Sequence, residues 1–260
     1  MRILLGIPSG GNPTKEFLSS LATLRLPERC TAFDRYTVSG NFVPAQREMI
    51  VRRALALTAD AVLMIDDDMV VPPDALENLS ATLEGDSGAA IAGALYYSRD
   101  GIRPMVADGW TSSDMTGASI PPFDDCTPTA VDAVGFGCVL IRISALKMLA
   151  PPFFGAQIYM ETGAARARLC NEDYLLCERL RQSGYRVLLH PGVRCGHVDR
   201  ESDRVIPLTW EPADVTNRRR MIVVEPGPRY AVVDYDPSLP RARERHLAAP
   251  LTYVSVEERF

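Results

Sequence analysis

The chain has 260 residues, of which 47% are hydrophobic and 23% are charged, and its formal net charge is -5 at pH 7. This length suffices for one large α/β domain with a substantial core, and the acidic balance argues against a protein that binds nucleic acid over its whole surface. No apolar run approaches the roughly 18 residues of a membrane span, and the apolar N-terminal stretch is too short for a signal peptide, so we expect no transmembrane segment.

The cysteines are scattered along the chain and include no Cys-x-x-Cys pair. Metal-binding and redox motifs usually place two cysteines close together, and disulfide frameworks belong to small secreted domains. The pattern therefore predicts reduced thiols that serve as small core residues, and a cytoplasmic location. The six are Cys30, Cys126, Cys138, Cys170, Cys177 and Cys195.

The first hundred residues alternate between strand and helix patterns. Strands are predicted over residues 2–7, 31–38, 61–65 and 88–97, and helices over residues 14–24, 45–58 and 73–83. The strand over 88–97 is built of small apolar residues, as in strands that are buried on both faces. This alternation predicts an α/β fold with a mostly parallel central sheet flanked by helices.

The middle of the chain has a different composition. Residues 99–129 are rich in Gly, Pro, Asp and Ser and contain Trp110. A connection of this length inside a compact domain is usually functional or disordered, so we expect a lid or an acceptor wall. Residues 130–141 then read as strand, kink and strand, with Gly135 and Gly137 on either side of Phe136. Such glycines indicate a close approach of the backbone to a ligand or another strand, and a simple bulge is an equal alternative.

The remaining elements are predicted to be a short helix over 144–149, a helix over 171–184 and strands over 185–189 and 193–198. The longer helix carries Glu172 and Asp173 in its first turn, and His197 lies in the last strand. From residue 201 the composition shifts to Arg, Pro and Glu. We therefore divide the chain into a domain over 1–200 and an extension over 201–260, which packs on the domain or on a partner subunit and offers a route to a homo-oligomer.

Three consecutive carboxylates, Asp66, Asp67 and Asp68, end the apolar strand over residues 61–65. Like charges crowded at a strand end repel one another unless a positive group neutralises them. Hard divalent cations prefer carboxylate oxygens and usually bridge to substrate phosphates, and open α/β sheets bind ligands at the carboxyl ends of their strands. A solvated acidic turn is the structural alternative.

The Asp triplet, the Glu172-Asp173 pair opening a helix and the later His197 occur in a fixed order that resembles the GT-A fold glycosyltransferases, in particular the family-2-like enzymes, over roughly residues 2–200. The resemblance implies a GT-A fold, Rossmann-like as in nucleotide-diphospho-sugar transferases. By this resemblance, the triplet corresponds to the DxD motif and Glu172-Asp173 to the ED motif. His197 corresponds to a metal ligand that comes late in the chain. The resemblance also implies nucleotide-sugar contacts from Pro8, Ser9, Gly10, Arg47, Asp66 and Asp67. Glu48 departs from the relatives, which often have Asn there.

The implied reaction moves a sugar from a nucleotide-diphosphate sugar to a hydroxyl acceptor. Mn²⁺ or Mg²⁺, held by Asp66, Asp68 and His197, would neutralise the leaving diphosphate, and the His nitrogen favours Mn²⁺. An acceptor hydroxyl must lose its proton during an inverting attack, so Asp173 is the expected catalytic base and Glu172 its partner. The acceptor-side residues would be Gly135, Phe136, Gly137 and Trp110. Helix-dipole pairing is the structural alternative for the acidic pair.

Two other functions compete with this one. A sugar-phosphate nucleotidyltransferase shares the layout, but its first loop needs an arginine to hold a triphosphate, and residues 8–15 contain none. A nucleotide-sugar- or DNA-binding module without turnover is kept open by the basic patches Arg218-Arg219-Arg220 and 241–245. A glycosyltransferase whose acceptor is a nucleic acid or a modified base would combine both features.

Overall fold

The computed structural model describes residues 1–40, 42–99, 101, 103–112, 126–155, 157–160, 167–206, 220–223 and 231–234. The chain forms two compact units, Met1–Leu208 and Thr209–Phe260. Only the hairpin of β15 (Arg220–Val223) and β16 (Ala231–Asp234) is described in the second unit. The predicted basic patches at 218–220 and 241–245 fall outside the described residues, apart from the backbone of Arg220.

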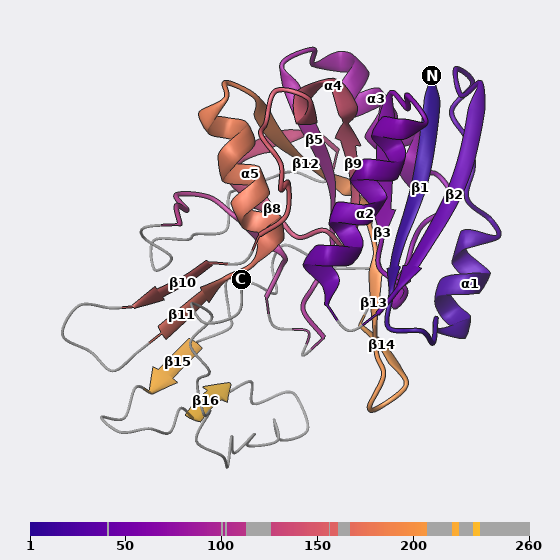
Figure 1. Cartoon of the computed structure of the whole chain (residues 1–260). Coiled ribbons are helices and arrows are strands. Elements are labelled where there is room, and N and C mark those ends of the chain that lie inside the picture. The colour runs from indigo at the N-terminus through magenta and orange to yellow at the C-terminus, as the bar shows by residue number, and fades with distance from the viewer. Residues whose placement is uncertain are drawn as a thin grey trace. The chain divides into compact units, whose positions relative to one another are not determined.

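The first unit is organised around a seven-stranded sheet in the order β2-β1-β3-β9-β5-β12-β7 (Figure 1). Five strands run in one direction and two, β7 and β9, run in the opposite direction. The predicted mostly parallel α/β sheet is therefore confirmed. The strands are β1 (Arg2–Ser9), β2 (Ala32–Ser39), β3 (Ala61–Ile65), β5 (Ala89–Leu95), β7 (Thr129–Val131), β9 (Cys138–Arg142) and β12 (Arg186–Arg194).

Helices cover the sheet on both faces. Side chains alternate between faces along a strand. On β1, Ile3, Leu5 and Ile7 share a core cluster with α1 and α3, whereas Gly6 lies against Ile50 of α2, so α2 packs on the opposite face. The helices are α1 (Lys15–Leu21), α2 (Val43–Ala56), α3 (Ala75–Gly85), α4 (Ile143–Leu146) and α5 (Glu172–Gln182). The Thr14 hydroxyl caps α1 by accepting a hydrogen bond from the Phe17 amide.

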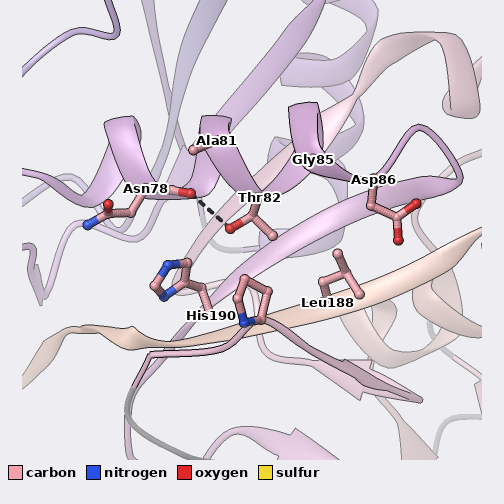
Figure 2. A pocket seen from close by; sticks show the side chains of 8 residues that line it. Asn78, Ala81, Thr82, Gly85, Asp86, Leu188 and His190 are labelled. Carbon is pink, nitrogen blue, oxygen red and sulfur yellow. Dashed lines mark hydrogen bonds between the residues drawn. The ribbon is translucent and has the colours of Figure 1, made fainter.

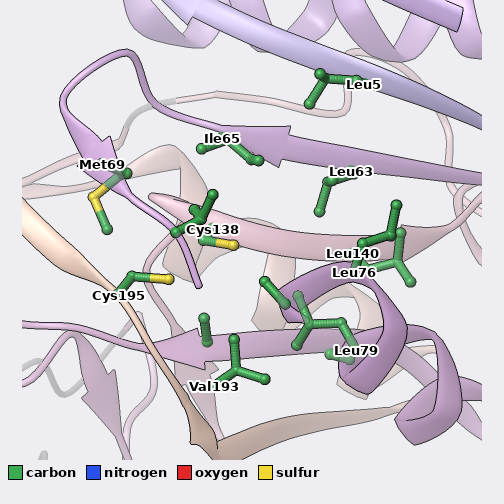
Figure 3. Close-up of a cluster of buried hydrophobic side chains, with 14 of the residues drawn as sticks. Leu5, Leu63, Ile65, Met69, Leu76, Leu79, Cys138, Leu140, Val193 and Cys195 are labelled. Carbon is green, nitrogen blue, oxygen red and sulfur yellow. The ribbon is translucent and has the colours of Figure 1, made fainter. Parts of the chain in front are cut away.

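The core extends to the carboxyl edge of the sheet. Figure 3 shows the labelled leucines of β1, β3, β9 and α3 meeting Ile65, Met69 and Val193. Cys138 and Cys195 lie at the end of this cluster, and both are buried, as are Cys170 and Cys177. These four cysteines therefore act as the small core residues that the sequence predicts. Among the described residues, no helix is both long and apolar enough to cross a membrane.

A three-stranded sheet in the order β14-β13-β4 lies beyond the carboxyl end of β3. It consists of β4 (Met69–Val70), β13 (Gly196–Asp199) and β14 (Arg204–Ile206). The register pairs His197 with Met69, and the Val198 amide donates to the Asp68 carbonyl at 2.8 Å. This short sheet brings His197 back to the Asp triplet.

Most of the predicted elements are present, and three details differ. The strand predicted to stop at residue 189 continues through Pro191 to Arg194 as β12. Within the connection over 99–129, β6 (Val106–Ala107) pairs with β8 (Ala133–Val134), which fixes that part of the segment to the domain. Residues 113–125, where the rest of the expected lid falls, lie outside the described residues. The hairpin of β10 (Gln157–Met160) and β11 (Ala167–Cys170) is an element that the sequence did not indicate.

The glycines around Phe136 lie against the side chain of Tyr96, which directly follows β5. A Cβ atom at Gly135 would lie 2.2 Å from the Tyr96 hydroxyl, and one at Gly137 would lie 2.7 Å from Tyr96 Cζ. The Gly137 amide donates to the Tyr96 hydroxyl at 2.9 Å. The two glycines therefore leave room for the buried ring of Tyr96 at the end of β5, and no ligand is needed to account for them.

Candidate functional site

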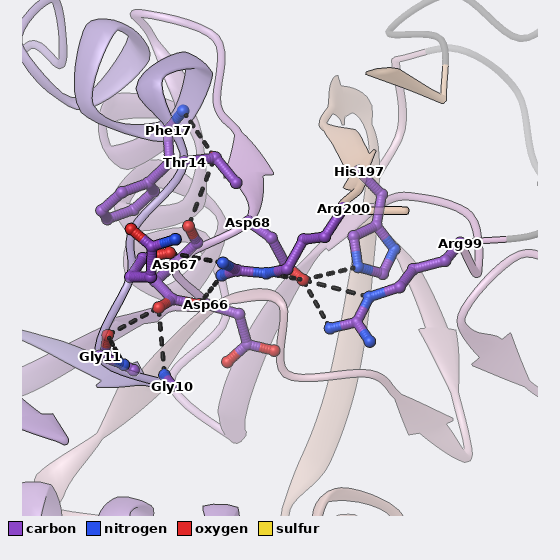
Figure 4. A network of polar contacts seen from close by, with 12 residues as sticks. Gly10, Gly11, Thr14, Phe17, Asp66, Asp67, Asp68, Arg99, His197 and Arg200 are labelled. Atoms are coloured by element: carbon purple, nitrogen blue, oxygen red, sulfur yellow. Dashed lines mark hydrogen bonds and ion pairs between the residues drawn. The ribbon is translucent and has the colours of Figure 1, made fainter. Parts of the chain in front are cut away.

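The three consecutive aspartates at the end of β3 face three different sets of partners, and Figure 4 shows the contacts of Asp67 and Asp68. Asp66 turns toward α2, where both of its carboxylate oxygens accept from Arg47 Nη2 at 3.0 Å. Its backbone amide donates to the Gly137 carbonyl at 3.0 Å, which extends the β3–β9 ladder. Burial raises the pKa of Asp66, although Arg47 opposes that shift. The structure therefore places this predicted metal and nucleotide ligand in an ion pair.

Arg47 joins the Asp triplet to the first turn of α5. Its Nη1 donates to Glu172 Oε1 at 2.6 Å, and its guanidinium carbon lies 5.5 Å from the centroid of the Phe136 ring. Only 4% of the residue is exposed. Burial acts to lower the pKa of Arg47, but the carboxylates of Asp66, Glu172 and Asp173 outweigh it and raise that pKa. Arg47 therefore remains charged and holds the predicted DxD and ED motifs together.

Asp67 holds the loop after β1. Its Oδ2 accepts from the Ser9 hydroxyl at 2.6 Å and from the Gly10 amide at 3.2 Å, and its Oδ1 accepts from Arg200 Nη2 at 2.6 Å. The side chain is 9% exposed. Ser9 and Gly10, two of the predicted donor-binding residues, are thus positioned by the middle aspartate, next to the buried Pro8.

Asp68 is the most deeply buried of the three, with 1% of the residue exposed. Its Oδ2 accepts from Arg99 Nε at 3.1 Å and Nη2 at 2.5 Å, and it lies 3.6 Å from His197 Nε2 and 3.8 Å from Arg200 Nε. Burial alone would raise the pKa of this carboxyl. His197 and Arg99 more than offset it and lower the pKa to about 2, so Asp68 is ionised at neutral pH.

His197 presents one ring nitrogen to Asp68 and anchors the other. Nδ1 lies 2.8 Å from the Tyr97 carbonyl oxygen, and because a carbonyl only accepts hydrogen bonds, we assign the hydrogen to Nδ1. The ring also meets Tyr96 edge-on, with centroids 5.7 Å apart. Without a proton, Nε2 is an acceptor that directs its lone pair toward the Asp68 carboxylate, whereas a proton on Nε2 lets the ring donate to Asp68 and lowers the pKa of that carboxyl. Two acceptors facing each other favour a positive group between them.

This pair has the donor chemistry of a divalent cation site. Ligating histidines commonly donate their second ring N–H to a backbone carbonyl, as His197 does. In the described part of the chain, no group of three or more His, Cys, Asp or Glu side chains gathers as around a metal ion. Asp68 and His197 would therefore supply two ligands, which suits a cation that also takes water or phosphate oxygens.

Asp173 lies in the first turn of α5, and 7% of it is exposed. Its Oδ1 accepts from the Tyr174 amide at 2.8 Å. Burial, aided by the charge of Glu172, raises its pKa to about 6, and Arg47 opposes this rise. The N-terminal end of a helix favours an ionised carboxyl, whereas burial of Asp173 acts in the other direction. Asp173 is still largely ionised at pH 7 and is a stronger base than an exposed aspartate.

Comparison with known proteins gives matches at the level of structure. No family model matches the chain, and no curated protein matches its sequence. The crystal structure of A197 from STIV matches with a TM-score of 0.55 and 17% identity, over 81% of this chain and 96% of that one. GalNAc-T7, solved with UDP, GalNAc and Mn²⁺, matches with a TM-score of 0.51 and 13% identity, over 77% of this chain and 44% of that one.

The chain has a GT-A-like fold. At these identities the likeness concerns the fold alone, and the finer assignment to family 2 stays a prediction. In this GT-A-like domain the carboxyl edge of β3 carries the Asp triplet, while β13 and α5 bring His197 and the acidic pair toward it.

The predicted acceptor-side residues are buried. Phe136 is fully buried and meets Phe154 edge-on, with centroids 6.0 Å apart. Trp110 is 4% exposed and packs edge-on against Tyr174, with centroids 5.2 Å apart. These aromatic rings line the interior next to Arg47 and Asp173, and a role in acceptor binding stays a prediction.

Sequence reasoning missed two arginines of the site, Arg99 and Arg200. Arg99 comes shortly after the buried strand β5, and Arg200 directly follows β13. Both positions follow strand ends near the carboxyl edge of the sheet, which is the signal that could have identified them. Glu48 also has a structural role, because its Oε2 accepts from the Phe153 and Phe154 amides at 2.7 and 3.2 Å.

A cavity of about 370 Å³ lies elsewhere in the domain, between α3 and β12 (Figure 2). Thr82 and His190 line it, and the Thr82 hydroxyl donates to the Asn78 carbonyl at 2.9 Å. Its lining shares no residue with the predicted site, so it has no part in the proposal below.

Proposed function

We propose that the chain is a glycosyltransferase that moves a sugar from a nucleotide-diphosphate sugar to a hydroxyl acceptor with the help of a divalent cation. The observation that carries this proposal is the pairing of Asp68 with His197 Nε2, 3.6 Å apart, at the carboxyl edge of a GT-A-like sheet. The presence of UDP, GalNAc and Mn²⁺ in the GalNAc-T7 structure supports the same chemistry.

The charges of the site favour a divalent cation. Among the described residues of the site, five carboxyl groups lie near three guanidinium groups, those of Arg47, Arg99 and Arg200, and with all of them ionised the negative charges exceed the positive by two. The carboxylates are Asp66, Asp67, Asp68, Glu172 and Asp173. Asp68 and His197 would hold the cation, and the mixed oxygen and nitrogen donors suit Mn²⁺ better than Mg²⁺. When bound, the cation would neutralise charge on the leaving diphosphate.

Asp173 would act as the base of an inverting transfer. Its pKa of about 6 makes it largely ionised at neutral pH and able to accept the proton of an acceptor hydroxyl. Arg47 would position this end of α5 through Glu172 while it holds Asp66 on the other side. Ser9 and Gly10, fixed by Asp67, would contact the donor nucleotide at the same edge.

The test is a donor screen followed by turnover. Thermal shift with UDP, GDP, CDP and dTDP, each with and without Mn²⁺, should reveal one nucleotide that stabilises the protein only when the metal is present. Release of that nucleotide from its sugar conjugates then measures turnover. Asp68→Asn should abolish the metal-dependent stabilisation. Asp173→Asn should lower the turnover rate by about 10²–10⁴-fold while donor binding persists.

Glu178→Gln is the matched control for Asp173→Asn, because Glu178 lies on the same helix and is 8% exposed. This variant should keep the wild-type rate. Nucleotide binding without turnover would favour a binding module. Pyrophosphate release from a nucleoside triphosphate and a sugar phosphate would identify a nucleotidyltransferase, and either result would contradict the proposal.

A further inference from the structure

Arg99 is hydrogen-bonded to the Asp68 carboxylate, which the proposed cation would need as a ligand. It lies in the turn after β5, where the Gly101 amide donates to the Ser98 carbonyl at 2.7 Å. Two of its nitrogens, Nε and Nη2, donate to one and the same oxygen, Oδ2 of Asp68. The Asp68 side chain is 2% exposed, whereas that of Arg99 is 59% exposed, so the guanidinium covers the buried carboxylate from the solvent side (Figure 4).

A cation at Asp68 and His197 would compete with Arg99 for this oxygen. His197 Nε2 lies 3.6 Å from Asp68 Oδ2, the oxygen that Arg99 contacts. A metal held by both side chains would draw on the same carboxylate oxygen that Arg99 contacts. The guanidinium keeps its charge and has no acceptor to offer the metal. Two positive groups on one oxygen repel each other, so each weakens the binding of the other.

Arg200 is held more firmly than Arg99. Its Nη2 donates to Asp67 Oδ1 at 2.6 Å, its Nη1 donates to the Asn12 carbonyl, and its Nε is 3.8 Å from Asp68 Oδ2. Its side chain is 33% exposed. Because Arg200 has these partners on Asp67 and Asn12, Arg99 is the residue that can leave Asp68 at least cost to the loop after β1.

We infer that Arg99 exchanges the Asp68 carboxylate for the diphosphate of the donor when the cation binds, so that cation and donor bind cooperatively. This inference rests on the proposed function. A planar guanidinium can donate two parallel hydrogen bonds to phosphate oxygens, as it does to a carboxylate. In the free protein Arg99 weakens cation binding, and with a diphosphate present the same residue strengthens it. The Arg99 side chain therefore couples the binding of the cation to the binding of the donor diphosphate.

The first arm of the test measures Mn²⁺ alone by calorimetry, with MnCl₂ as the titrant and no nucleotide. Arg99→Gln should bind Mn²⁺ about tenfold more tightly than the wild type, which is within the usual range of such couplings. Arg99→Lys keeps a competing charge and should stay close to the wild type. Arg186→Gln is the matched control, because Arg186 pairs with Asp86 away from the site, and its Mn²⁺ affinity should be unchanged.

The second arm repeats the titration with UDP, GDP, CDP and dTDP in turn, each at saturation. The nucleotide should strengthen Mn²⁺ binding in the wild type, and in Arg99→Gln this gain should be smaller by about tenfold. If a nucleotide and Mn²⁺ bind together but Mn²⁺ alone binds Arg99→Gln no more tightly than the wild type, the exchange is overturned and the proposed function stands. If none of the four nucleotides strengthens Mn²⁺ binding in the wild type, the exchange onto phosphate is overturned together with the proposed donor.

Discussion

Asp66, Asp67 and Asp68 are chemically identical neighbours, yet each is bound to a different part of the domain. Asp66 pairs with Arg47 of α2, Asp67 accepts from the loop after β1, and Asp68 faces β13 and Arg99. The three side chains point in different directions from the end of β3. Substitution of one aspartate should therefore affect one function, and we expect Asp67 to act mainly on the conformation of the first loop.

The buried carboxyl of Asp173 should lower the free energy of unfolding at neutral pH. Its folded pKa of about 6 exceeds the ordinary value of 3.8, so the folded state binds the proton more tightly and stability falls as pH rises from about 4 to about 6. At about 1.4 kcal/mol per pKa unit, the shift corresponds to about 3 kcal/mol of unfolding free energy above that range. Asp173→Asn, which carries no charge, should unfold at higher urea concentration than the wild type at pH 7.5.

This gain should disappear in the same measurement at pH 4, where Asp173 is protonated in the folded state. Asp86→Asn is the control, and it should lower the stability at neutral pH where Asp173→Asn raises it. Arg186 lowers the pKa of Asp86, and the variant loses that ion pair. An Asp173→Asn variant that is less stable than the wild type at pH 7.5 would show that the carboxylate supports the fold.

At the scale of elements, the contact between β1 and α2 sets the position of Arg47. Gly6 of β1 lies under Ile50 of α2, and a Cβ atom at this glycine would meet Ile50 Cγ2 at 2.2 Å. Ile50 lies one turn after Arg47 on the same helix. Any side chain at position 6 would push α2 away from the sheet and move Arg47 relative to Asp66 and Glu172.

Gly6→Ala should lower the free energy of unfolding by about 1–3 kcal/mol, the usual cost of overpacking a core. Chemical denaturation measures it. Gly85→Ala is the control, because a Cβ atom there meets nothing within 4 Å. The double variant Gly6→Ala with Ile50→Ala should be more stable than the sum of the two single effects predicts. Strict additivity would show that the contact does not control this packing.

At the scale of the whole molecule, the chain separates into two units, and the described site lies entirely within Met1–Leu208. The seven-stranded sheet, its helices and the β14-β13-β4 sheet all belong to this unit. Among the described residues, the sheets of this unit are formed by its own strands. The predicted boundary at residue 200 would have removed β14, which pairs with the strand that carries His197.

A chain that ends at Leu208 should consequently fold on its own and keep its melting temperature within about 3 °C of the full chain, which corresponds to about 1 kcal/mol at this size. Differential scanning calorimetry measures it. Light scattering on both chains tests the prediction that the extension forms a homo-oligomer, since only the full chain should then exceed the monomer mass. A chain that ends at Asp199, without β14, is the comparison, and we expect it to be the less stable one. Loss of cooperative unfolding in the Leu208 chain would contradict the division.

Local patterns in the sequence predict most of the elements and the edge of the sheet that carries the candidate site. The strand over residues 61–65 agrees with β3 at both ends, and the helix with Glu172 in its first turn begins where the acidic pair predicts. These features are local, because apolar periodicity and capping residues act within a few positions of one another. The order of the strands along the sheet depends on contacts between distant segments, and no local pattern predicts it.

The tertiary structure decided which charges meet. The pairing of β13 with β4 brings His197 to Asp68, and the ends of β5 and β13 bring Arg99 and Arg200 to the same carboxylates. Gly135 and Gly137 are explained by Tyr96, a residue on another strand's end. Contacts between residues distant in the sequence depend on strand register and side-chain packing. Neither quantity is encoded in a local pattern, so only the folded chain shows that arginines lie where a cation would bind.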